Sequence, residues 1–301
     1  MTLAEAGELT EEGARAYLEA IRWPDGPVCV KCGNVEVTRL QGKATRPGVL
    51  KCKGCRQQFT VTVGTIFEDS HLPLRKWVLA FHLMCGAKKG ISALQLKRHL
   101  GIAYKSAWHM AHRIRHAMQA EPLRSMLSGT VEVDETYVGG KPRFRHRRHS
   151  TKPRPPSNKV PVVALVERGG KVRTRVVADV TAKTLKDAIR ENVARDSRIM
   201  TDEHKSYEGI GRELKSHDVV KHGHGQYVRG DAYTNTAESF FGLLKRGVMG
   251  AFHHVSKEHL PRYCEEFAYR WNTRHATDSE RTAAAIRQTE GRRLMYRGPT
   301  L

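Results

Sequence analysis

Apolar residues recur at the spacing of α-helices between residues 72 and 119. In the segment 72–90 they fall on one helical face, and the pattern stops at a glycine. A shorter helix is predicted over 91–102, closed by Gly101, and a longer one over 103–119. A short helix, a glycine turn and a basic second helix form the outline of a helix-turn-helix, although a three-helix bundle with no role in DNA binding has the same pattern.

The pattern changes beyond residue 129, where short segments rich in β-branched residues predominate. Strands are predicted at 130–140, 159–170, 171–181, 197–207 and 216–222. Helices are predicted at 182–194, 235–248 and 256–275. Gly169 and Gly170, between the second and third strands, are typical of a hairpin turn. We write the order as β-β-β-α-β-α-β-α, which predicts an α+β or mixed α/β layer built on an initial antiparallel meander.

Four of the six cysteines form two Cys-x2-Cys pairs separated by nineteen residues: Cys29, Cys32, Cys52 and Cys55. Each pair is typical of a tight turn that presents two thiolates, and an intervening hairpin brings the turns together around one tetrahedral Zn²⁺. Gly33 and Gly54 suit such turns, and the segment 58–67 is predicted to supply a strand. Two disulfides are the alternative. Cys85 and Cys264 lie in helical patterns and are predicted to be small core residues.

Composition adds a strong charge to this outline. The 301 residues include 52 Lys and Arg against 31 Asp and Glu, a net charge of +21, and the pI is near 10.0. Such a field favours a polyanionic partner, nucleic acid above all, because cationic contacts release counterions from phosphates. A generally basic soluble protein is the alternative. No apolar run reaches the roughly 18 residues of a membrane span, and the acidic N-terminus does not resemble a secretory signal, so we expect a cytoplasmic, nucleoid-associated protein without a membrane partner.

Basic residues concentrate in two places. The segment 141–159 holds eight Lys or Arg, four prolines and no acid, and is predicted to be a mobile insertion between the first two strands. The helix at 103–119 carries Lys and Arg together with histidines that we expect to form a solvated surface facing phosphates. The predicted DNA contacts are Lys105, Arg113, Arg143, Arg145, Arg147, Arg148 and Lys245.

Three carboxylates stand at unusual positions in the second half. Asp134 lies in the middle of a predicted strand, although aspartate is a poor strand former. Asp202 closes another strand, and Glu238 lies in the first turns of a helix. Such a set can hold two Mg²⁺ or Mn²⁺ ions about 4 Å apart, which activate an oxygen nucleophile and stabilise the leaving oxygen of a phosphodiester displacement. Lys245 follows Glu238 by two turns on the same helix face, where it would grip a phosphate.

Each acid also has a structural interpretation. Asp134 faces solvent if its strand lies at the edge of the sheet. Asp202 caps a turn if its side chain bonds to the backbone that follows. Glu238 lies three residues after Asn235, the spacing of a capping box. Lys245, beside Arg246, is by itself more typical of a solvated pair.

Five segments in order carry a resemblance that covers most of residues 23–276: "CKGCRQQFTVTVGTIFEDSHLPLRKWVLAF", "VEVDETYVGGK", "TDEHKSY", "NTAESFFGLLKRGV" and "FAYRWNTR". The chain resembles bacterial insertion-sequence transposases with an N-terminal zinc ribbon and an RNase H-like DDE domain built on a central mixed sheet. The resemblance implies that Asp134, Asp202 and Glu238 are the metal-binding triad and that Lys245 is the lysine of a DDE…K signature. It also implies that the zinc ribbon and the helix-turn-helix help to recognise terminal inverted repeats.

The resemblance implies a division of the chain and a reaction. We expect an N-terminal helix and zinc ribbon at 1–70, a helix-turn-helix region at 71–122, the catalytic domain at 125–276 and a tail at 277–301. Water would cut a phosphodiester at a transposon end, and the freed 3′-hydroxyl would attack target DNA, with no covalent protein intermediate. Because two double-stranded ends must meet, we expect a homodimer or a larger assembly on DNA, with one structural Zn²⁺ and two Mg²⁺ or Mn²⁺ ions per active site.

Two other functions remain open at this point. A zinc ribbon and a helix-turn-helix suffice for a DNA-binding regulator, which has no use for three converging acids. A metal-dependent nuclease would use the acids but would not join strands.

Overall fold

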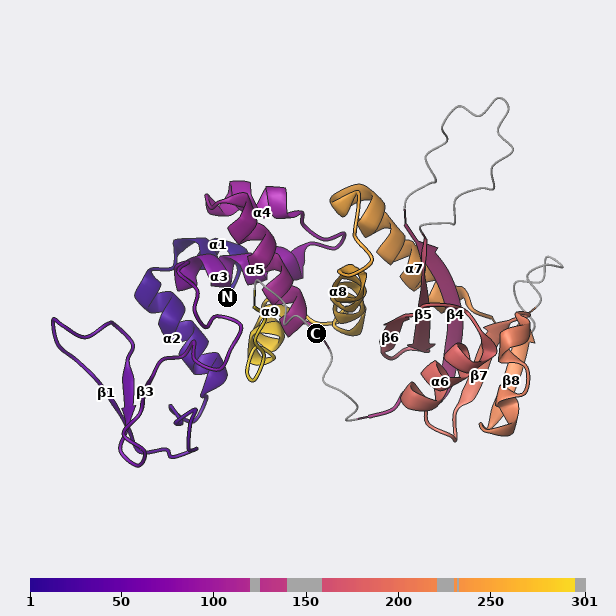
Figure 1. Cartoon of the computed structure of the whole chain (residues 1–301), viewed down its shortest axis with the longest axis horizontal. Coiled ribbons are helices and arrows are strands. Elements are labelled where there is room, and N and C mark those ends of the chain that lie inside the picture. Colours follow the sequence, from indigo (N-terminus) through magenta and orange to yellow (C-terminus); the bar gives the residue numbers. More distant parts are fainter. Residues whose placement is uncertain (120–124, 140–158, 221–229, 232, 296–301) are drawn as a thin grey trace, which may run out of the picture. The chain divides into compact units, whose positions relative to one another are not determined.

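The computed structural model describes residues 1–119, 125–139, 159–220, 230–231 and 233–295. The chain forms two compact units (Figure 1): the first combines residues 1–119 with 273–301, and the second comprises residues 120–272. Within the described residues, no helix combines the length and the apolar character needed to cross a membrane.

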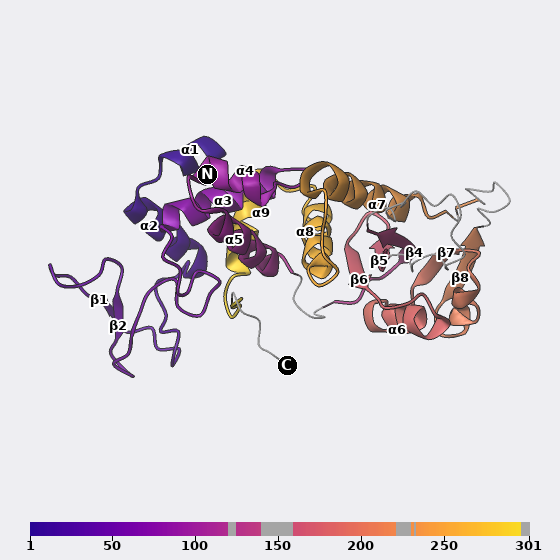
Figure 2. The same cartoon turned by 45° about the horizontal axis from the view of Figure 1, so that its top comes forward.

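The first unit is a helical bundle with a small sheet. Its helices are α1 (Leu3–Glu8), α2 (Glu11–Arg22), α3 (Leu74–Gly86), α4 (Ala93–Leu100), α5 (Tyr104–Ala117) and α9 (Asp278–Arg287). The apolar α3 contacts all five of the others (Figures 1 and 2), and its Trp77, Phe81 and Met84 are fully buried. The C-terminal α9, which begins at a Thr277–Glu280 capping box, therefore completes the core of the N-terminal unit.

The predicted helix-turn-helix outline is present in the first unit. Helix α4 begins at a capping box made by Ser92 and Gln95 and ends at Gly101, whose φ of 58° is left-handed. Glycine reaches this conformation at little cost, which is why the chain can turn sharply there into α5. Helices α4 and α5 pack against each other and against α3.

The second unit is built on a five-stranded mixed sheet. The strands are β4 (Thr130–Val138), β5 (Val160–Glu167), β6 (Val172–Val176), β7 (Arg198–Asp202) and β8 (Ser216–Val220). Their order is β6-β5-β4-β7-β8; β4 pairs antiparallel with β5 and parallel with β7. Gly169 has a φ of 71° in the predicted hairpin between β5 and β6. The acid-bearing β4 is therefore the central strand of the sheet.

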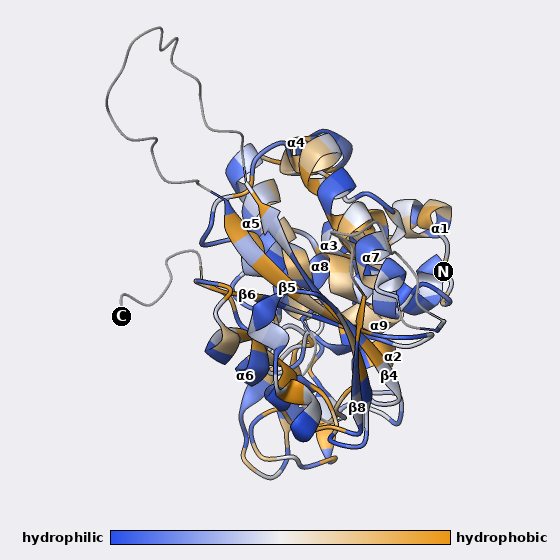
Figure 3. Cartoon of the chain, turned by 90° about the vertical axis from the view of Figure 1, so that its right-hand side faces the viewer, coloured by the Kyte–Doolittle hydropathy of each residue, from blue (hydrophilic) through white to orange (hydrophobic). Residues whose placement is uncertain are grey.

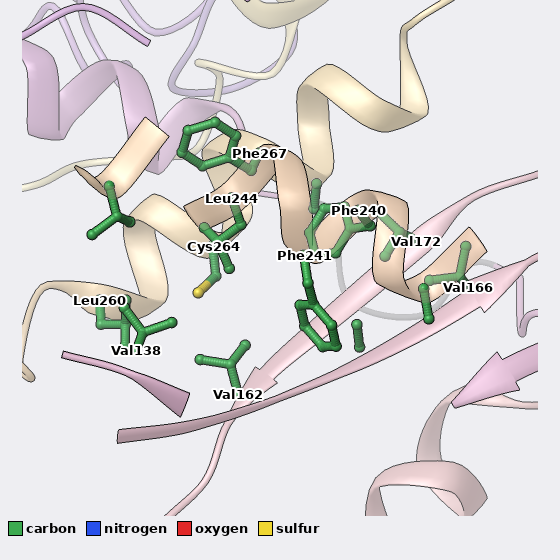
Figure 4. Close-up of a cluster of buried hydrophobic side chains, with 14 of the residues drawn as sticks. Val138, Val162, Val166, Val172, Phe240, Phe241, Leu244, Leu260, Cys264 and Phe267 are labelled. Atoms are coloured by element: carbon green, nitrogen blue, oxygen red, sulfur yellow. The ribbon is translucent and has the colours of Figure 1, made fainter. Parts of the chain in front are cut away.

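Helices cover both faces of this sheet. Helix α6 (Ala182–Asn192) packs on the face formed by Val131, Val133, Val163 and Leu165. Helices α7 (Asn235–Gly247) and α8 (Leu260–Asn272) pack on the other face (Figure 4), where Phe240, Leu244 and Phe267 meet valines of β4, β5 and β6. The seven residues from Val160 to Val166 are buried on both faces, and the hydrophobic colour runs along β5 in Figure 3.

Two predictions about elements are corrected. Between β7 and β8 the chain makes two 3-10 turns, η1 (Lys205–Tyr207) and η2 (Ile210–Arg212), and α7 and α8 both follow β8. The observed order, β-β-β-α-β-β-α-α, is that of the predicted ranges, so the written order β-β-β-α-β-α-β-α is wrong; a π-helical segment, η4 (Val248–Phe252), follows α7. In the first unit the predicted strand at 58–67 shrinks to β3 (Gln58–Phe59), because the backbone turns from residue 61 onward.

Candidate active site and zinc ribbon

The four paired cysteines meet in the first unit. Strands β1 (Val37–Arg39) and β2 (Leu50–Cys52) form a hairpin that joins the two Cys-x2-Cys turns, and β3 pairs with β2. The four Sγ atoms lie within 4.8 Å of one another, with Cys29 3.6 Å from Cys55 and Cys32 3.6 Å from Cys52. All four are free thiols, so the disulfide alternative is wrong. Four sulfur ligands at this spacing fit one tetrahedral Zn²⁺.

The two cysteine turns differ in their backbone. Gly33 has the expected left-handed φ of 75°, and its N–H donates to the Cys29 carbonyl. Gly54 does not have a positive φ; in the second turn Arg56 does, at 61°. A glycine is required at position 54 for another reason, because a Cβ there would lie 2.6 Å from Nδ2 of Asn34. Burial opposes ionisation of Cys29, but the Lys31 and Cys32 backbone N–H groups outweigh it and lower its pKa to about 6.

The parallel pairing of β4 and β7 brings Asp134 and Asp202 to the same level. Their ladder aligns Glu132 with Met200, and the same register continued by two residues sets Asp134 opposite Asp202. Side chains alternate along a strand, so both aspartates lie on the face opposite to Val133 and α6. Asp202 is the last residue of β7, at the end of a parallel strand where α/β sheets open crevices, whereas β4 continues past Asp134 to Val138.

Glu238 comes to this face from α7. The helix has Thr234, and not Asn235, as its N-cap, and the Glu238 N–H donates to the Thr234 carbonyl at 3.1 Å. The side chain of Glu238 is exposed, and its charge acts on Asp134. Lys245 is exposed in the last turn of the same helix.

Repulsion among the acids is visible in the ionisation of Asp134. Burial, and then the charges of Glu135, Asp202 and Glu238, raise its pKa to about 7, although the Glu135 N–H donates to its carboxylate at 2.8 Å. Hard oxygen donors with an excess of negative charge fit divalent cations such as Mg²⁺. Among the described residues, however, the one compact group of three or more potential metal ligands is the cysteine cluster. The carboxylates are electrostatically coupled without being gathered as tightly.

The turn interpretation of Asp202 is correct for one of its oxygens. Oδ1 accepts a hydrogen bond from the His204 N–H at 3.1 Å, which orients the carboxylate beyond the end of β7. An edge position for Asp134 is excluded by the strand order.

Glu135, which follows Asp134 on the α6 face of β4, and Tyr207 form a pair beside the site that the sequence did not single out. The Tyr207 hydroxyl donates to the Glu135 carboxylate at 2.6 Å, and Tyr207 is almost fully buried. Burial raises the pKa of Glu135, and Asp202 raises it further. A tyrosine five residues after Asp202 carries no recognisable signal, because it reaches β4 only when η1 packs beside α6.

The structure changes the list of predicted DNA contacts. Lys105 is exposed at the start of α5. Arg113 is only 5% exposed, and its Nη2 donates to the Glu68 carbonyl while its guanidinium lies over the Trp77 ring. The prediction of Arg113 as a DNA contact is therefore wrong, as is that of a solvated His112, which is fully buried. Both lie on the core side of α5. The residues Arg143, Arg145, Arg147 and Arg148, and the insertion that carries them, lie outside the described residues.

The prediction for the two remaining cysteines holds. Cys85 and Cys264 are both 1% exposed, as expected of core residues. Trp271 packs edge-on against Phe240 and so joins α8 to α7 on the sheet.

Comparison with known proteins decides the family. Residues 126–272 match the ISXO2-like transposase domain, and residues 9–58 match the transposase zinc-ribbon domain. A protein of Halobacterium salinarum, described as an uncharacterized protein in transposable element ISH50, is 30% identical over 273 residues, 87% of this chain and 91% of that protein. The chain belongs to this family of insertion-sequence transposases. An uncharacterized transposase-like protein of Haemophilus influenzae is 33% identical to the transposase over 102 residues, 34% of this chain and 81% of that protein.

Similarity to solved structures is weak. The Mos1 strand transfer complex matches the transposase at 12% identity and a TM-score of 0.29, over 70% of this chain and 74% of that one. A simian T-cell lymphotropic virus intasome matches at 12% identity and a TM-score of 0.29, over 64% of this chain and 65% of that one. The predicted family is confirmed by the family matches, and the predicted fold class, a zinc ribbon with helices and a central mixed sheet, is confirmed by the cysteine cluster and the strand order.

The cysteine cluster predicts one zinc per chain. Elemental analysis of the purified transposase should give about one Zn²⁺, and Cys52→Ser should abolish it, because a tetrahedral site with three sulfur ligands loses most of its affinity. Cys264→Ser, a buried cysteine outside the cluster, is the matched control and should retain the metal. A wild-type protein that is folded and free of zinc would contradict the assignment.

The raised pKa of Asp134 predicts a pH-dependent effect of Asp134→Asn. The folded protein disfavours the ionised form of Asp134. The contribution of this residue to the unfolding free energy is therefore fully present below the unfolded pKa, near pH 4, and is lost as the pH rises to about 7. The variant should therefore exceed the wild type in unfolding free energy by roughly 1–3 kcal/mol above pH 7, and the difference should vanish below about pH 4. Denaturant unfolding in a zinc-containing buffer without Mg²⁺ or Mn²⁺ measures it.

Asp179→Asn is the control with the opposite sign. Hydrogen bonds from Thr184 and Thr181 lower the pKa of Asp179, so this stability is present above the unfolded pKa. Its removal should weaken the protein at neutral pH. Equal effects of the two variants would show that the folded protein does not disfavour the ionised form of Asp134.

Proposed function

We propose that this transposase binds the terminal inverted repeats of an insertion sequence, cuts the DNA there and joins the freed ends to target DNA. The observation that carries the proposal is the electrostatic coupling of Asp134, on the central strand β4, with Asp202 at the end of β7 and with Glu238 on α7. A protein that only binds DNA gains nothing from this repulsion. For that reason we do not favour the alternative of a DNA-binding regulator without enzymatic activity.

Asp134, Asp202 and Glu238 would hold the divalent cations. When bound, such ions supply Lewis-acid stabilisation of the attacking and leaving oxygens. The carboxylates hold their positions because two of them lie on neighbouring strands and the third lies on a helix packed against the same sheet. Lys245 lies seven residues from Glu238 on α7, two turns along, and would bind a phosphate oxygen beside them.

The reaction has two steps of the same kind. In the first, a water oxygen attacks a phosphodiester at the transposon end, and the 3′-hydroxyl leaves with a proton. In the second, that hydroxyl attacks a target phosphodiester, so one bond to phosphorus forms as another breaks. No protein side chain is covalently modified. Because two ends must react together, we expect a dimer or a larger assembly on DNA.

The helix-turn-helix offers the DNA-binding surface. The sequence contains no Asp or Glu from residue 70 to residue 120. Lys97, Arg98 and His99 are exposed in the last turn of α4, and Tyr104 and Lys105 are exposed where α5 begins. The start of the second helix is where such motifs meet base edges, whereas Arg113 and His112 are in the core. The proposed segments 1–70, 71–122, 125–276 and 277–301 stay a prediction.

A nuclease that cuts without joining is the second candidate, because the same acids serve both reactions. We expect the transposase, incubated with Mg²⁺ and DNA carrying its own flanking repeats, to yield nicked ends and joined products. Sequencing of the products separates the two functions, since hydrolysis without joined ends favours the nuclease. Asp134→Asn should reduce both products by at least about a thousandfold while DNA affinity is kept or raised, because a charge that repels phosphate is lost. Loss of binding together with activity would indicate a folding role.

The DNA-binding surface predicts a salt-dependent loss. Lys105→Ala should weaken binding to repeat DNA and reduce the slope of log affinity against log salt by about 1. Lys183→Ala, which removes an exposed lysine at the start of α6, is the charge-matched control and should change the slope little. Equal slopes for the two variants would contradict the assignment of this surface.

A further inference from the structure

We propose that Glu132 is a positioning residue, which fixes the start of α7, and with it Glu238, against the strand that carries Asp134. This inference rests on the proposed function. Glu132 is 0% exposed, lies two residues before Asp134 and shares its face of β4. A fully buried carboxylate is costly unless it is paired, so the contacts that it makes identify its role.

Glu132 occupies the place of an N-cap for α7. Its Oε2 accepts hydrogen bonds from the backbone N–H groups of Thr236 at 2.8 Å and Ala237 at 3.0 Å. Its Oε1 accepts from the Thr236 hydroxyl at 2.8 Å. The N-cap residue itself, Thr234, makes no side-chain cap. A negative charge satisfies the first N–H groups of a helix and is favoured by the helix dipole.

Arg168 completes this arrangement from the end of β5. Its Nε donates to Oε1 of Glu132 at 2.7 Å. Its two other nitrogens donate to the carbonyls of Asp231 and Tyr233, at 2.7 and 2.9 Å, and its guanidinium lies 3.6 Å from the Tyr233 ring centroid. The residues just before α7 are therefore held to the same carboxylate as its first turn. We call Glu132, Arg168 and Thr236 the α7 clamp.

The clamp fixes the part of α7 that carries Glu238, one of the proposed metal ligands. Ala237, whose N–H donates to Glu132, directly precedes Glu238, so displacement of the first turn of α7 displaces that carboxylate. The apolar contacts of Phe240 and Leu244 hold the rest of α7 on the sheet. Such contacts are not directional, so they do not by themselves fix the rotation of the helix about its axis. The directional hydrogen bonds of the clamp fix that rotation. In metalloproteins, groups outside the metal site orient the metal ligands in the same way.

Glu132→Gln tests the clamp with little change of shape. When the amide oxygen accepts the two backbone N–H groups, the amide NH₂ faces the Arg168 Nε–H, so one donor loses its acceptor. We expect single-turnover cleavage of bound repeat DNA to slow by about ten- to a hundredfold, and the Mn²⁺ concentration for half-maximal rate to rise by a similar factor. In the absence of DNA, the Mn²⁺-induced rise in Tm should shrink at a fixed Mn²⁺ concentration. DNA affinity should not change.

A second, milder variant covers the case in which Glu132→Gln folds poorly. Thr236→Val keeps the backbone N–H and the branched shape and removes only the hydroxyl that donates to Glu132. It should raise the Mn²⁺ requirement in the same direction by a smaller factor. Thr184→Val is its match: this threonine, in the first turn of α6, donates to Asp179 at 2.7 Å, but α6 carries none of the triad. Thr184→Val should leave the Mn²⁺ requirement unchanged.

Glu266→Gln is the matched control for the buried charge. Glu266 is also 0% exposed and pairs with Arg270 at 2.6 Å, but it lies on α8. If Glu132→Gln and Glu266→Gln raise the Mn²⁺ requirement alike, or if neither does, Glu132 has a structural role only and the proposal is overturned. If Asp134→Asn remains fully active, the proposed function itself fails, a result that the clamp variants cannot mimic.

Discussion

Repulsion between carboxylates is the constraint on which the catalytic unit of this transposase depends. Asp134 and Asp202 lie on neighbouring strands, and burial together with the charges of Glu135, Asp202 and Glu238 raises the pKa of Asp134 to about 7. Side chains that repel one another stay together only when the backbone that carries them cannot move apart. The apolar strand β5 and the helices packed on both faces provide that rigidity.

Hydrogen bonds hold the acids, or the elements next to them, in place against this repulsion. The Tyr207 hydroxyl holds Glu135, the turn after β7 holds Asp202, and Glu132 with Arg168 holds the start of α7. Each contact restricts an element that carries or adjoins an acid. A cation bound by these acids, as proposed, would meet groups that are already held in place, which would reduce the ordering that binding must impose.

The first unit is stabilised in a different way, by its cysteine cluster and by helices packed around α3. Its zinc ribbon has only short strands, and four thiols around one ion replace the core that such a sheet lacks. The helices pack around α3, and α9 completes that core from the far end of the chain. Consequently the basic residues at the end of α4 and the start of α5 stand on a rigid base, whereas Arg113 and His112 serve the interior.

The sequence by itself predicted most of the elements, the cysteine cluster and the family, because periodicity, spacing and motifs along the chain carry these signals; the roles of Asp134, Asp202 and Glu238 stay a prediction. It did not distinguish the two sides of α5, since charged and apolar residues alternate there and only packing against Trp77 shows that Arg113 is inside. Nor did it place Gly54, whose reason is the close approach of Asn34. Glu132 was the largest omission. Its three partners, Arg168, Thr236 and Ala237, lie 36, 104 and 105 residues away along the chain. Only the tertiary structure joins them, because a buried charge acquires its role from the donors that folding brings to it.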